Sequence, residues 1–561
     1  MNLLSNFLDR VDFESYEDYY NNYKLNIPKD FNFAYDVIEQ YAKIQYDKRA
    51  IVWCNDEGEE EIFSFGRLNE EVNKAANFFK RIGIKKGDFV MLILRRHYQF
   101  WISMYALHKI GAVAIPATHL LTKKDIVFRC NSADVKMIIC SDKGDIYEHV
   151  KESISECKTV EKLCVLGKEK HDGWYNFDLE IQNESAEFIR PTGDEATHNS
   201  DPMLVYFTSG TTGNRKMVLH SFTYPLGHIS TGKYWHNVQD DGLHLTVADS
   251  GWAKCSWGKL YGQFIAGTAQ FIYDYSDKFV PTDLLDLIVK YKITTFCAPP
   301  TIYRFFIKSD MKKYDLSTLK HISTAGEALN PEVFNQIYNA TGLKVYEGFG
   351  QTESPILLGT FMWDTPHPGS MGRPSANFKA VLLRDDFSIC DPGEIGQIAF
   401  DIKDGKPAGV LDCYYKDQEK TDSVFSHGYY LTGDLAWCDE EGFYWYVGRA
   451  DDVIKSSGYR IGPFEVESAL MEHPAVFETA ITAVPDEMRG QIVKATIVLA
   501  KGYKPSDELK KEIQDHVKKT TAPYKYPRIV EFVDELPKTI SGKIKRAQLR
   551  EDDKAKSQTN K

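Results

Sequence analysis

The stretch MLVYFTSGTTGNRKMVL, residues 203–219, places a loop rich in glycine, threonine and serine between two apolar segments. The apolar ends of this stretch are typical of buried strands. Between them, Gly210 and Gly213 allow a backbone with positive φ and bring N–H groups close to a ligand. Hydroxyl donors and the mobile charge of Lys216 suit polyphosphate, so the pattern predicts a phosphate-binding loop.

This loop is not a Walker A motif. It lacks the GxxxxGK[ST] pattern, and the apolar residues Val218 and Leu219 follow where a helix would begin. A plain hairpin turn between two strands stays open as an alternative, because glycine, threonine and asparagine all favour turns. The density of donors beside Arg215 and Lys216 favours phosphate binding over a plain turn.

Short apolar runs alternate with helix-like segments around this loop. Residues 90–94 suit a strand that is buried on both faces, and residues 98–110 have helical character that ends at Gly111. Similar apolar runs occur at 113–115, 135–140, 163–166, 294–297 and around Ile322. Strands that alternate with helices indicate an α/β fold with a largely parallel sheet.

The character of the chain changes near residue 450. A predicted helix begins at Pro463, with Glu465 and Glu467 near its positive end, and Ser506 is placed to cap a second helix. A chain of 561 residues is also too long for one hydrophobic core. We therefore expect a large N-terminal α/β domain, residues 1–450, and a small α+β C-terminal domain, residues 451–561.

Composition excludes several classes of protein. The net charge of −12 argues against nonspecific nucleic-acid binding. The ten cysteines form no CxxC pair, which favours a reducing compartment. No run of about 18 apolar residues predicts a membrane span, and acids such as Asp9 and Asp12 near the N-terminus are unlike a secretory or mitochondrial leader. We expect a cytoplasmic protein; the oligomeric state, including a homo-oligomer, stays open.

The phosphate loop is the first of six motifs that occur in a fixed order. The others are YEGFGQTE (346–353), YLTGD (430–434), GRADD (448–452), SGYRIGP (457–463) and PKTISGK (537–543). Together they resemble the adenylate-forming superfamily, which includes acyl-CoA synthetases, firefly luciferase and the adenylation domains of peptide synthetases. Within it, the segments 251–263, 294–306, 456–480 and 521–550 are similar to medium-chain acyl-CoA synthetases.

The resemblance implies a site for ATP and Mg²⁺. It places Thr211 and Thr352 on the phosphates, and Glu353 on Mg²⁺, a cation that prefers carboxylate and phosphate oxygens. It places Asp434 and Arg449 on the ribose, although an Asp after Thr-Gly is also a common turn residue. The other positions that the resemblance assigns to the nucleotide are Thr208, Ser209, Gly210, Thr212, Gly213, Lys216, Gly326, Glu327, Ala328, Glu347, Gly348 and Phe349.

The resemblance also implies a mobile C-terminal domain. It places Lys543 between the carboxylate and the α-phosphate during adenylation, with a solvated surface lysine as the alternative. The domain then turns about a hinge at Asp451 and exchanges Lys543 for the segment around Gly458. There, a missing side chain leaves room for the pantetheine arm of CoA, and Arg460 is placed to meet a phosphate.

The acid-binding pocket is less sharply indicated. Acetate-activating relatives carry a tryptophan at the position aligned with Gly350, so glycine here predicts room for a longer or branched chain. Trp252, Trp257 and Cys297 resemble pocket positions of medium-chain enzymes, with ordinary core residues as the alternative. Three roles are open for Lys254. Its side chain contacts the substrate carboxylate, pairs with an acidic side chain, or extends to water.

These observations predict an AMP-forming acyl-CoA synthetase that joins a short- or medium-chain or branched carboxylic acid to coenzyme A. Two alternatives stay open. One is an enzyme of the same fold that uses an aromatic acid or a non-CoA acceptor. The other is a non-catalytic nucleotide-binding homologue or scaffold, which the joint presence of Lys543, Glu353 and Asp434 disfavours.

Overall fold

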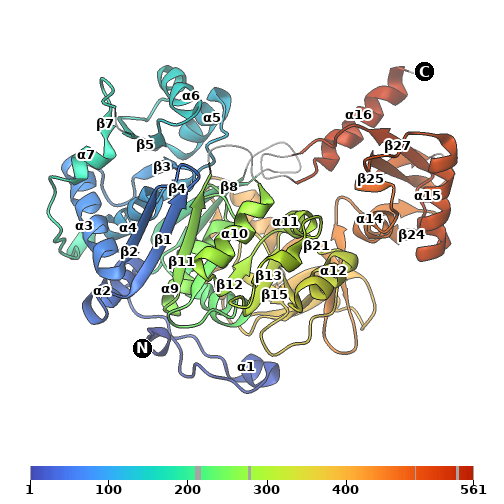
Figure 1. Cartoon of the computed structure of the whole chain (residues 1–561), viewed down its shortest axis with the longest axis horizontal. Helices are drawn as coiled ribbons and strands as arrows, with labels where there is room; N and C mark the ends of the chain where they lie inside the picture. Colours follow the sequence, from blue (N-terminus) through green and yellow to red (C-terminus); the bar gives the residue numbers. More distant parts are fainter. Residues whose placement is uncertain are drawn as a thin grey trace.

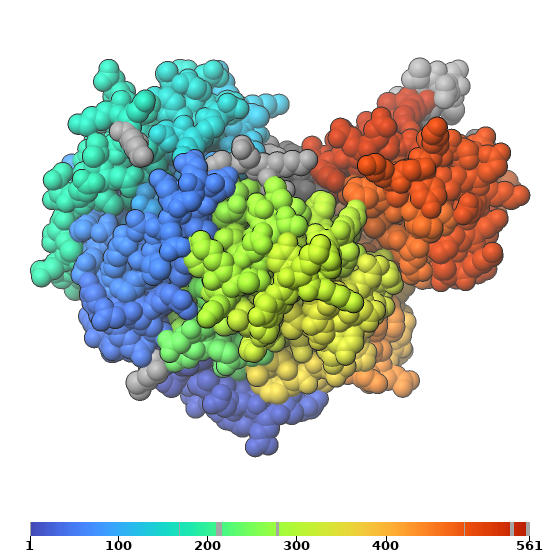
Figure 2. Space-filling model, viewed as in Figure 1, coloured from blue at the N-terminus to red at the C-terminus, as the bar shows by residue number. Residues whose placement is uncertain are grey.

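The computed structural model describes residues 2–559 apart from residues 168, 209–215, 276–279, 487 and 539–542 (Figure 1). The strands of the described residues form three sheets. Two of them belong to a large body built by the first four fifths of the chain. The third belongs to a C-terminal lobe that projects from this body (Figure 2).

The first sheet contains the strands that flank the predicted phosphate loop. In spatial order its strands are β19 (Cys413–Tyr414), β9 (Lys216–Ser221), β8 (Pro202–Thr208), β4 (Val113–Pro116), β3 (Phe89–Ile93), β5 (Val135–Ser141), β6 (Lys162–Leu166) and β7 (Tyr175–Asn176). The strands from β8 to β7 pair in parallel, as predicted. By contrast, β8 and β9 pair antiparallel, with Thr208 opposite Lys216. The two strands that flank the predicted phosphate loop are therefore antiparallel neighbours.

The second sheet changes from parallel to antiparallel at β14 (Val345–Gly350). On the parallel side follow β13 (His321–Ala325), β12 (Thr295–Cys297), β10 (Leu243–Thr246), β11 (Ala269–Asp274) and β1 (Arg49–Asn55), with β2 (Glu60–Ser64) antiparallel at the edge. On the antiparallel side follow β15 (Ile356–Gly359), β16 (Ser370–Pro374), β22 (Tyr444–Arg449), β21 (Tyr429–Cys438), β18 (Gly396–Asp401) and β17 (Lys379–Leu383), with β20 (Phe425–Ser426) beside β21. Three of the six motifs, YEGFGQTE, YLTGD and GRADD, thus meet around this one sheet.

The C-terminal lobe has its own sheet and its own core. Its strands are β24 (Tyr459–Ile461), β23 (Ile454–Ser456), β26 (Gly490–Leu499), β25 (Val476–Asp486) and β27 (Ile529–Val533). Its helices are α14 (Pro463–Met471), α15 (Asp507–Thr520) and α16 (Arg546–Thr559). Buried Ile454, Val466, Ile481 and Val517 belong to a separate apolar cluster. The predicted combination of a large α/β domain with a small C-terminal domain is confirmed; the boundary after residue 450 stays a prediction.

Local sequence signals account for several helix ends. Helix α4 (Gln99–Ile110) ends at Gly111, which has φ of 74°, as glycine allows. Pro463 occupies the first turn of α14, and the Ser506 side chain accepts a hydrogen bond from the Leu509 N–H at the start of α15. The other helices of the large body are α1 (Tyr16–Asn22), α2 (Gln40–Ile44), α3 (Phe65–Arg81), α5 (Lys123–Ala133), α6 (Ile146–Ser153), α7 (Phe177–Ile181), α8 (Tyr224–Gly227), α9 (Gly262–Ile265), α10 (Pro281–Tyr291), α11 (Pro300–Phe306), α12 (Pro331–Thr341) and α13 (Gln418–Val424).

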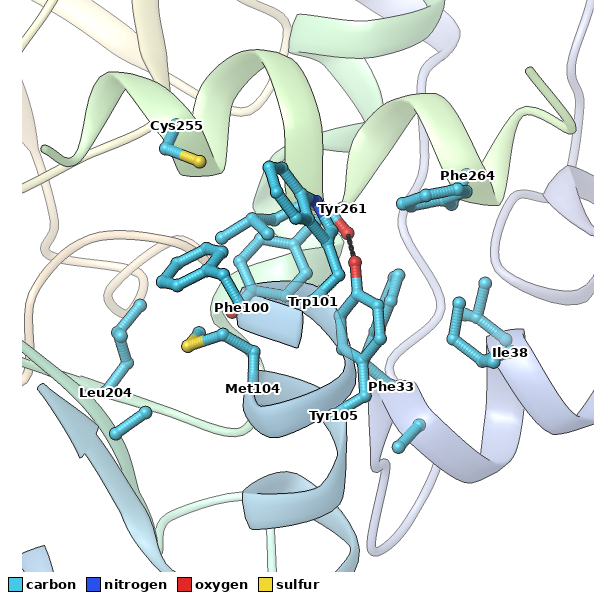
Figure 3. Close-up of a cluster of buried hydrophobic side chains, with 14 of the residues drawn as sticks. Phe33, Ile38, Phe100, Trp101, Met104, Tyr105, Leu204, Cys255, Tyr261 and Phe264 are labelled. Atoms are coloured by element: carbon cyan, nitrogen blue, oxygen red, sulfur yellow. Dashed lines mark hydrogen bonds between the residues drawn. The ribbon is translucent and has the colours of Figure 1, made fainter. Parts of the chain in front are cut away.

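A buried aromatic cluster fixes the segment that carries the candidate acid pocket. It lies between α4 and residues 255–264, and Figure 3 shows Trp101 and Tyr105 of α4 beside Tyr261. The Trp101 indole N–H donates to the Lys259 carbonyl at 2.9 Å, and the Tyr105 hydroxyl donates to the Leu260 carbonyl at 2.8 Å. Buried polar groups of aromatic side chains need such partners. The main chain around Trp257 is therefore held from the core side.

Candidate active site

The flanks of the phosphate loop lie beside a carboxylate. The candidate residues Ser209, Gly210, Thr211, Thr212 and Gly213 lie outside the described residues. Thr208 ends β8, and Lys216 begins β9 half-buried, with its Nζ 5.4 Å from the centre of the Tyr414 ring. Burial lowers the pKa of Lys216. The Tyr414 hydroxyl in turn donates to Glu353 Oε1 at 2.8 Å.

Thr352 and Glu353 follow β14 and are held through their main chains. The His220 ring donates to the Thr352 carbonyl at 2.9 Å, and the Leu411 N–H donates to the Glu353 carbonyl at 2.7 Å. The side chain of Glu353 thereby lies on the same side as Lys216, whose pKa its negative charge tends to raise. The structure brings these predicted phosphate and metal residues together.

Asp434 is the most enclosed carboxylate of the predicted ribose site, at 4% exposure. It lies on β21 opposite Arg449 of β22, whose Nη1 is 3.4 Å from Asp434 Oδ2. The Gln351 amide donates to the same oxygen at 2.5 Å, and the Tyr446 hydroxyl donates to Oδ1 at 3.3 Å. Burial raises the pKa of Asp434, which these donors and Arg449 oppose. Asp434 is thus a held acceptor and not a free turn residue.

The predicted adenine segment follows the carboxyl end of β13. Gly326 comes directly after this strand with φ of 105°, a conformation that favours glycine. Glu327 and Ala328 continue the segment, and neighbouring β14 carries Gly348 opposite Ala325. Ligands of α/β proteins bind beyond the carboxyl ends of parallel strands. The segment therefore lies where a nucleotide base is expected.

Glu347 and Phe349 flank Gly348 on β14. Phe349 is partly buried against the apolar cluster below the antiparallel strands. Glu347 is 4% exposed; its Oε1 accepts from the Leu329 N–H at 3.2 Å, whereas Oε2 has no hydrogen-bond partner among the described residues. Burial raises the pKa of Glu347 to about 8. Glu347 therefore has a raised pKa and lies at the bottom of the predicted adenine site.

The structure corrects the prediction of free space at Gly350. A Cβ atom at this position would lie 2.3 Å from the Trp257 ring and 2.5 Å from the Pro355 carbonyl. The Trp257 indole N–H donates to the Ser354 carbonyl at 3.0 Å, which fixes the ring there. The room left by glycine is thus filled by an indole from the chain itself, and Gly350 alone does not lengthen the pocket.

Lys254 lies on the same segment as Trp252 and Trp257. Its Nζ donates to the Ala325 carbonyl at 2.7 Å, and no carboxylate in the described part of the chain lies within 4.0 Å of it. Of the three roles, pairing with an acidic side chain is therefore wrong. Burial lowers the pKa of Lys254. Cys297, 1% exposed at the end of β12, lies near enough for its charge state to affect that pKa.

Lys543 has a small electrostatic effect on groups in both halves of this site. Burial raises the pKa of Asp434, and the positive charge of Lys543 opposes that rise. Burial lowers the pKa of Lys254, and the like charge of Lys543 lowers it further. Lys543 itself is exposed. It therefore lies within electrostatic reach of the predicted ribose carboxylate and of the predicted acid pocket at once.

The predicted CoA segment is placed elsewhere. Gly458 lies in the turn between β23 and β24 with φ of 85° and open space where a side chain would be. Arg460 pairs with Asp385 of the large body at 2.7 Å. Asp451, the predicted hinge, is half-exposed, with Oδ1 3.7 Å from Arg449 Nε. This arrangement presents Lys543 to the site and leaves the CoA segment at the edge.

Sequence reasoning missed several residues that shape the site. Gln351, Tyr414 and Tyr446 contact the candidate carboxylates, and the indole of Trp235 lies within 2.6 Å of a Cβ built on Gly348. Gln351 lies inside the YEGFGQTE motif, and its side-chain amide, which can both donate and accept hydrogen bonds, could have marked it as a site residue. Nothing in the sequence near Tyr414 or Trp235 indicates that they point into the site.

The described residues contain no cluster of three or more His, Cys, Asp or Glu side chains that could by itself hold a metal ion. Within the same residues, no helix is long and apolar enough to cross a membrane. A single carboxylate such as Glu353, beside Lys216 and the phosphate loop, still fits Mg²⁺, because this ion is commonly held by one or two carboxylates together with substrate phosphates.

Comparison with known proteins gives the family. Residues 38–415 match the family of AMP-binding enzymes, and residues 465–543 match the AMP-binding enzyme C-terminal domain. The chain therefore belongs to the AMP-binding enzyme family, and the predicted membership of the adenylate-forming superfamily is confirmed.

Named relatives narrow this assignment. The chain is 40% identical to acyl-coenzyme A synthetase ACSM3, mitochondrial, of Mus musculus over 96% of this chain and 93% of the relative. It is 41% identical to acyl-coenzyme A synthetase ACSM4, mitochondrial, of Mus musculus over 95% and 92%. The crystal structure of the anthranilate CoA ligase AuaEII in complex with anthranoyl-AMP superposes with a TM-score of 0.86 at 28% identity, covering 95% of this chain and 99% of that one.

Proposed function

We propose that the chain is an ATP-dependent acid–CoA ligase of the AMP-forming type, acting on a short- or medium-chain or branched carboxylic acid. The observation that carries this proposal is the enclosed pair of Asp434 and Arg449, with Nη1 3.4 Å from Oδ2. Gln351, which lies directly before Thr352 and Glu353, donates to the same carboxylate oxygen. The predicted nucleotide residues thus lie together, and Lys543 is the cation proposed to hold the acid against them. That is the arrangement needed to bring two anionic reactants together.

In the first half-reaction, a carboxylate oxygen of the acid attacks the α-phosphorus of ATP. The bond from that phosphorus to the bridging oxygen breaks, and pyrophosphate leaves. Lys216 and the phosphate loop hold the β- and γ-phosphates, Thr352 contacts the α-phosphate, and Asp434 with Arg449 holds the ribose. Mg²⁺, held by Glu353, would neutralise phosphate charge. Lys543 holds the carboxylate against the α-phosphate.

In the second half-reaction, the CoA thiol loses its proton to solvent and its sulfur attacks the acyl carbonyl, and AMP leaves with the electron pair of the acyl–oxygen bond that breaks. For this step the C-terminal domain turns about Asp451 and brings Gly458 to the site. Its open space, with no atom within 4 Å of a Cβ, suits the passage of a thin pantetheine arm. Arg460 then leaves Asp385 and becomes available to a CoA phosphate.

We infer a pocket of limited length from the aromatic rings near Gly348 and Gly350. The rings of Trp235 and Trp257, 6.0 Å apart and perpendicular, occupy the space beside Gly348 and Gly350. Lys254 adds one polar donor to an otherwise apolar wall. Because an apolar pocket discriminates one methylene by only about 1–3 kcal/mol, several related acids are expected to react. Aromatic acids stay in consideration, because one structural neighbour holds anthranoyl-AMP.

A panel of acids tests this proposal. Straight-chain, branched and aromatic acids are each incubated with the protein, ATP, Mg²⁺ and CoA, and AMP and acyl-CoA are measured together. We expect one AMP for each acyl-CoA, with the highest kcat/KM for a short, medium or branched acid. AMP formation without a thioester product would favour a different acceptor. The absence of AMP with every acid would favour the non-catalytic homologue.

Two further expectations rest on the sequence alone. A cytoplasmic location stays a prediction, and the names of the mouse relatives place those proteins in mitochondria. The oligomeric state, including a homo-oligomer, likewise stays open.

A further inference from the structure

Helix α16 begins three residues after Lys543, so whatever fixes this helix also fixes the lysine. The intervening residues span at most about 10 Å of extended chain. The residues directly after the lysine are also tied to the chain before its loop: the Lys545 N–H donates to the Pro537 carbonyl at 2.8 Å, and Ile544 bridges to Lys538. Lys543 is thus carried on a short arm with two described anchors, the base of its loop and the helix.

The first turn of α16 is tied to helix α14 by a partly buried ion pair. Arg546 donates from Nη2 to both carboxylate oxygens of Glu467, at 2.7 and 2.8 Å. The Glu467 side chain is 13% exposed and also accepts from the Ile481 N–H at 2.8 Å. Burial raises the pKa of Glu467, and Arg546 opposes that rise. Both oxygens of the Glu467 carboxylate therefore accept hydrogen bonds from Arg546, and one of them also accepts from a main-chain N–H.

The second turn of α16 is tied to the hinge itself. Arg550 pairs with Asp452, the residue next to the predicted hinge Asp451, and the Asp452 side chain is only 10% exposed. Between these two arginines, Leu549 is buried against Ala480 and Leu536. Polar and apolar contacts thus hold one face of the helix over the start of the C-terminal domain.

We propose that Asp452 and Glu467 are positioning residues for adenylation, which through Arg550 and Arg546 make the hinge, α16 and the Lys543 arm one rigid unit. This inference rests on the proposed function. All four residues lie on the C-terminal side of Asp451, so the two ion pairs travel with the domain. A rotation about the hinge then moves Lys543 together with the domain as a rigid body. Misplacement of a catalytic group by about 1 Å can cost about 10²-fold in rate.

The test is a charge reversal and its restoration in the full-length protein. Asp452→Arg, Arg550→Asp and the double exchange are compared in acid-dependent pyrophosphate–ATP exchange and in thioester formation from supplied acyl-adenylate. We expect each single reversal to lower the kcat of exchange at least 10-fold, with KM for ATP within twofold. Thioester formation should stay within threefold of the unmodified protein, and the double exchange should restore exchange at least partly.

Two controls keep the inference falsifiable. Lys510→Asp with Asp507→Lys reverses an exposed pair of the same domain and should leave both half-reactions unchanged. If the reversals fail to fold, Asp452→Asn, judged by its melting curve, must show the same selective loss. Equal loss of both half-reactions, normal exchange in folded single variants, or no restoration by the double exchange would overturn the inference. If the unmodified protein exchanges no pyrophosphate with any acid, it is the proposed function that fails.

Discussion

At the scale of a single residue, the buried carboxyl group of Glu347 makes the stability of the protein depend on pH. Its Oε2 has no hydrogen-bond partner among the described residues, and burial raises its pKa to about 8. An unfolded chain has the ordinary value of 4.5. Between these two values the folded state binds a proton that the unfolded state has lost, so the free energy of unfolding falls as pH rises.

A substitution that cannot ionise should remove this dependence. We expect Glu347→Gln to be more stable relative to the unmodified protein at pH 8 than at pH 5, since glutamine avoids the cost of a buried charge. The difference should grow by at most about 1.4 kcal/mol per pH unit across this window. Urea unfolding at both pH values measures it. A stability difference between the variant and the unmodified protein that does not change with pH would contradict a proton bound to Glu347 in the folded state.

For single residues, the sequence indicated which side chains belong to the site better than it indicated which side chains they contact. The YEGFGQTE motif led to Glu353 and Glu347, but the motif does not show that Gln351 reaches Asp434 or that Trp257 fills the space at Gly350. Those contacts depend on side-chain direction across strands that are distant in sequence. Ser209 to Gly213 lie outside the described residues, so their phosphate contacts stay predictions.

At the scale of the element, the turn between β23 and β24 combines a conformational requirement with open space. Gly458 has φ of 85°, so any other residue there is strained by roughly 1 kcal/mol. Gly458→Ala and Gly458→Leu share this strain, and only leucine fills the path proposed for pantetheine. The alanine variant is therefore the matched control for the leucine variant.

We expect Gly458→Leu to lose at least about 10²-fold in thioester formation from supplied acyl-adenylate, while Gly458→Ala loses less than tenfold, because blocked access misplaces the thiol. Pyrophosphate exchange should stay near normal in both variants. Stopped-flow release of AMP measures the thioester step. Equal losses in the two variants would assign the effect to the backbone and not to the path.

The short helix Ser256–Leu260 controls the pocket through Trp257. Trp257→Leu removes most of the ring that fills the space beside Gly350, so we expect the kcat/KM ratio of an eight-carbon to a four-carbon acid to rise roughly tenfold or more. The variant should also lose roughly 1–3 kcal/mol of stability through the cavity it leaves. Competition between the two acids measures the ratio. An unchanged ratio would place the acyl chain elsewhere.

At this scale most of the fold could be predicted. Apolar runs gave the strands of the parallel sheets, and Gly111, Pro463 and Ser506 marked helix ends because each has a specific backbone role. Strands β8 and β9, which flank the phosphate loop, pair antiparallel, while the choice between a phosphate-binding loop and a plain turn stays a prediction. Strand order could not be predicted, because pairing between distant strands leaves no local signal.

At the scale of the whole molecule, two bodies share one site. Lys543 comes from the C-terminal lobe and acts on Asp434 and Lys254 of the large body, whereas Gly458 stays at the edge. Such an arrangement separates two steps of one reaction in space and joins them by a turn of the lobe. The motif order predicted the two bodies, but the sequence alone does not show which face of the lobe meets the site.

The most direct test of this account is acid-dependent exchange of labelled pyrophosphate into ATP in the absence of CoA. We expect the unmodified protein to exchange label only when a reactive acid is present, and Lys543→Ala to lose about 10²-fold or more while it still converts supplied acyl-adenylate to acyl-CoA. An acid that yields acyl-CoA but supports no exchange without CoA would contradict the adenylate route.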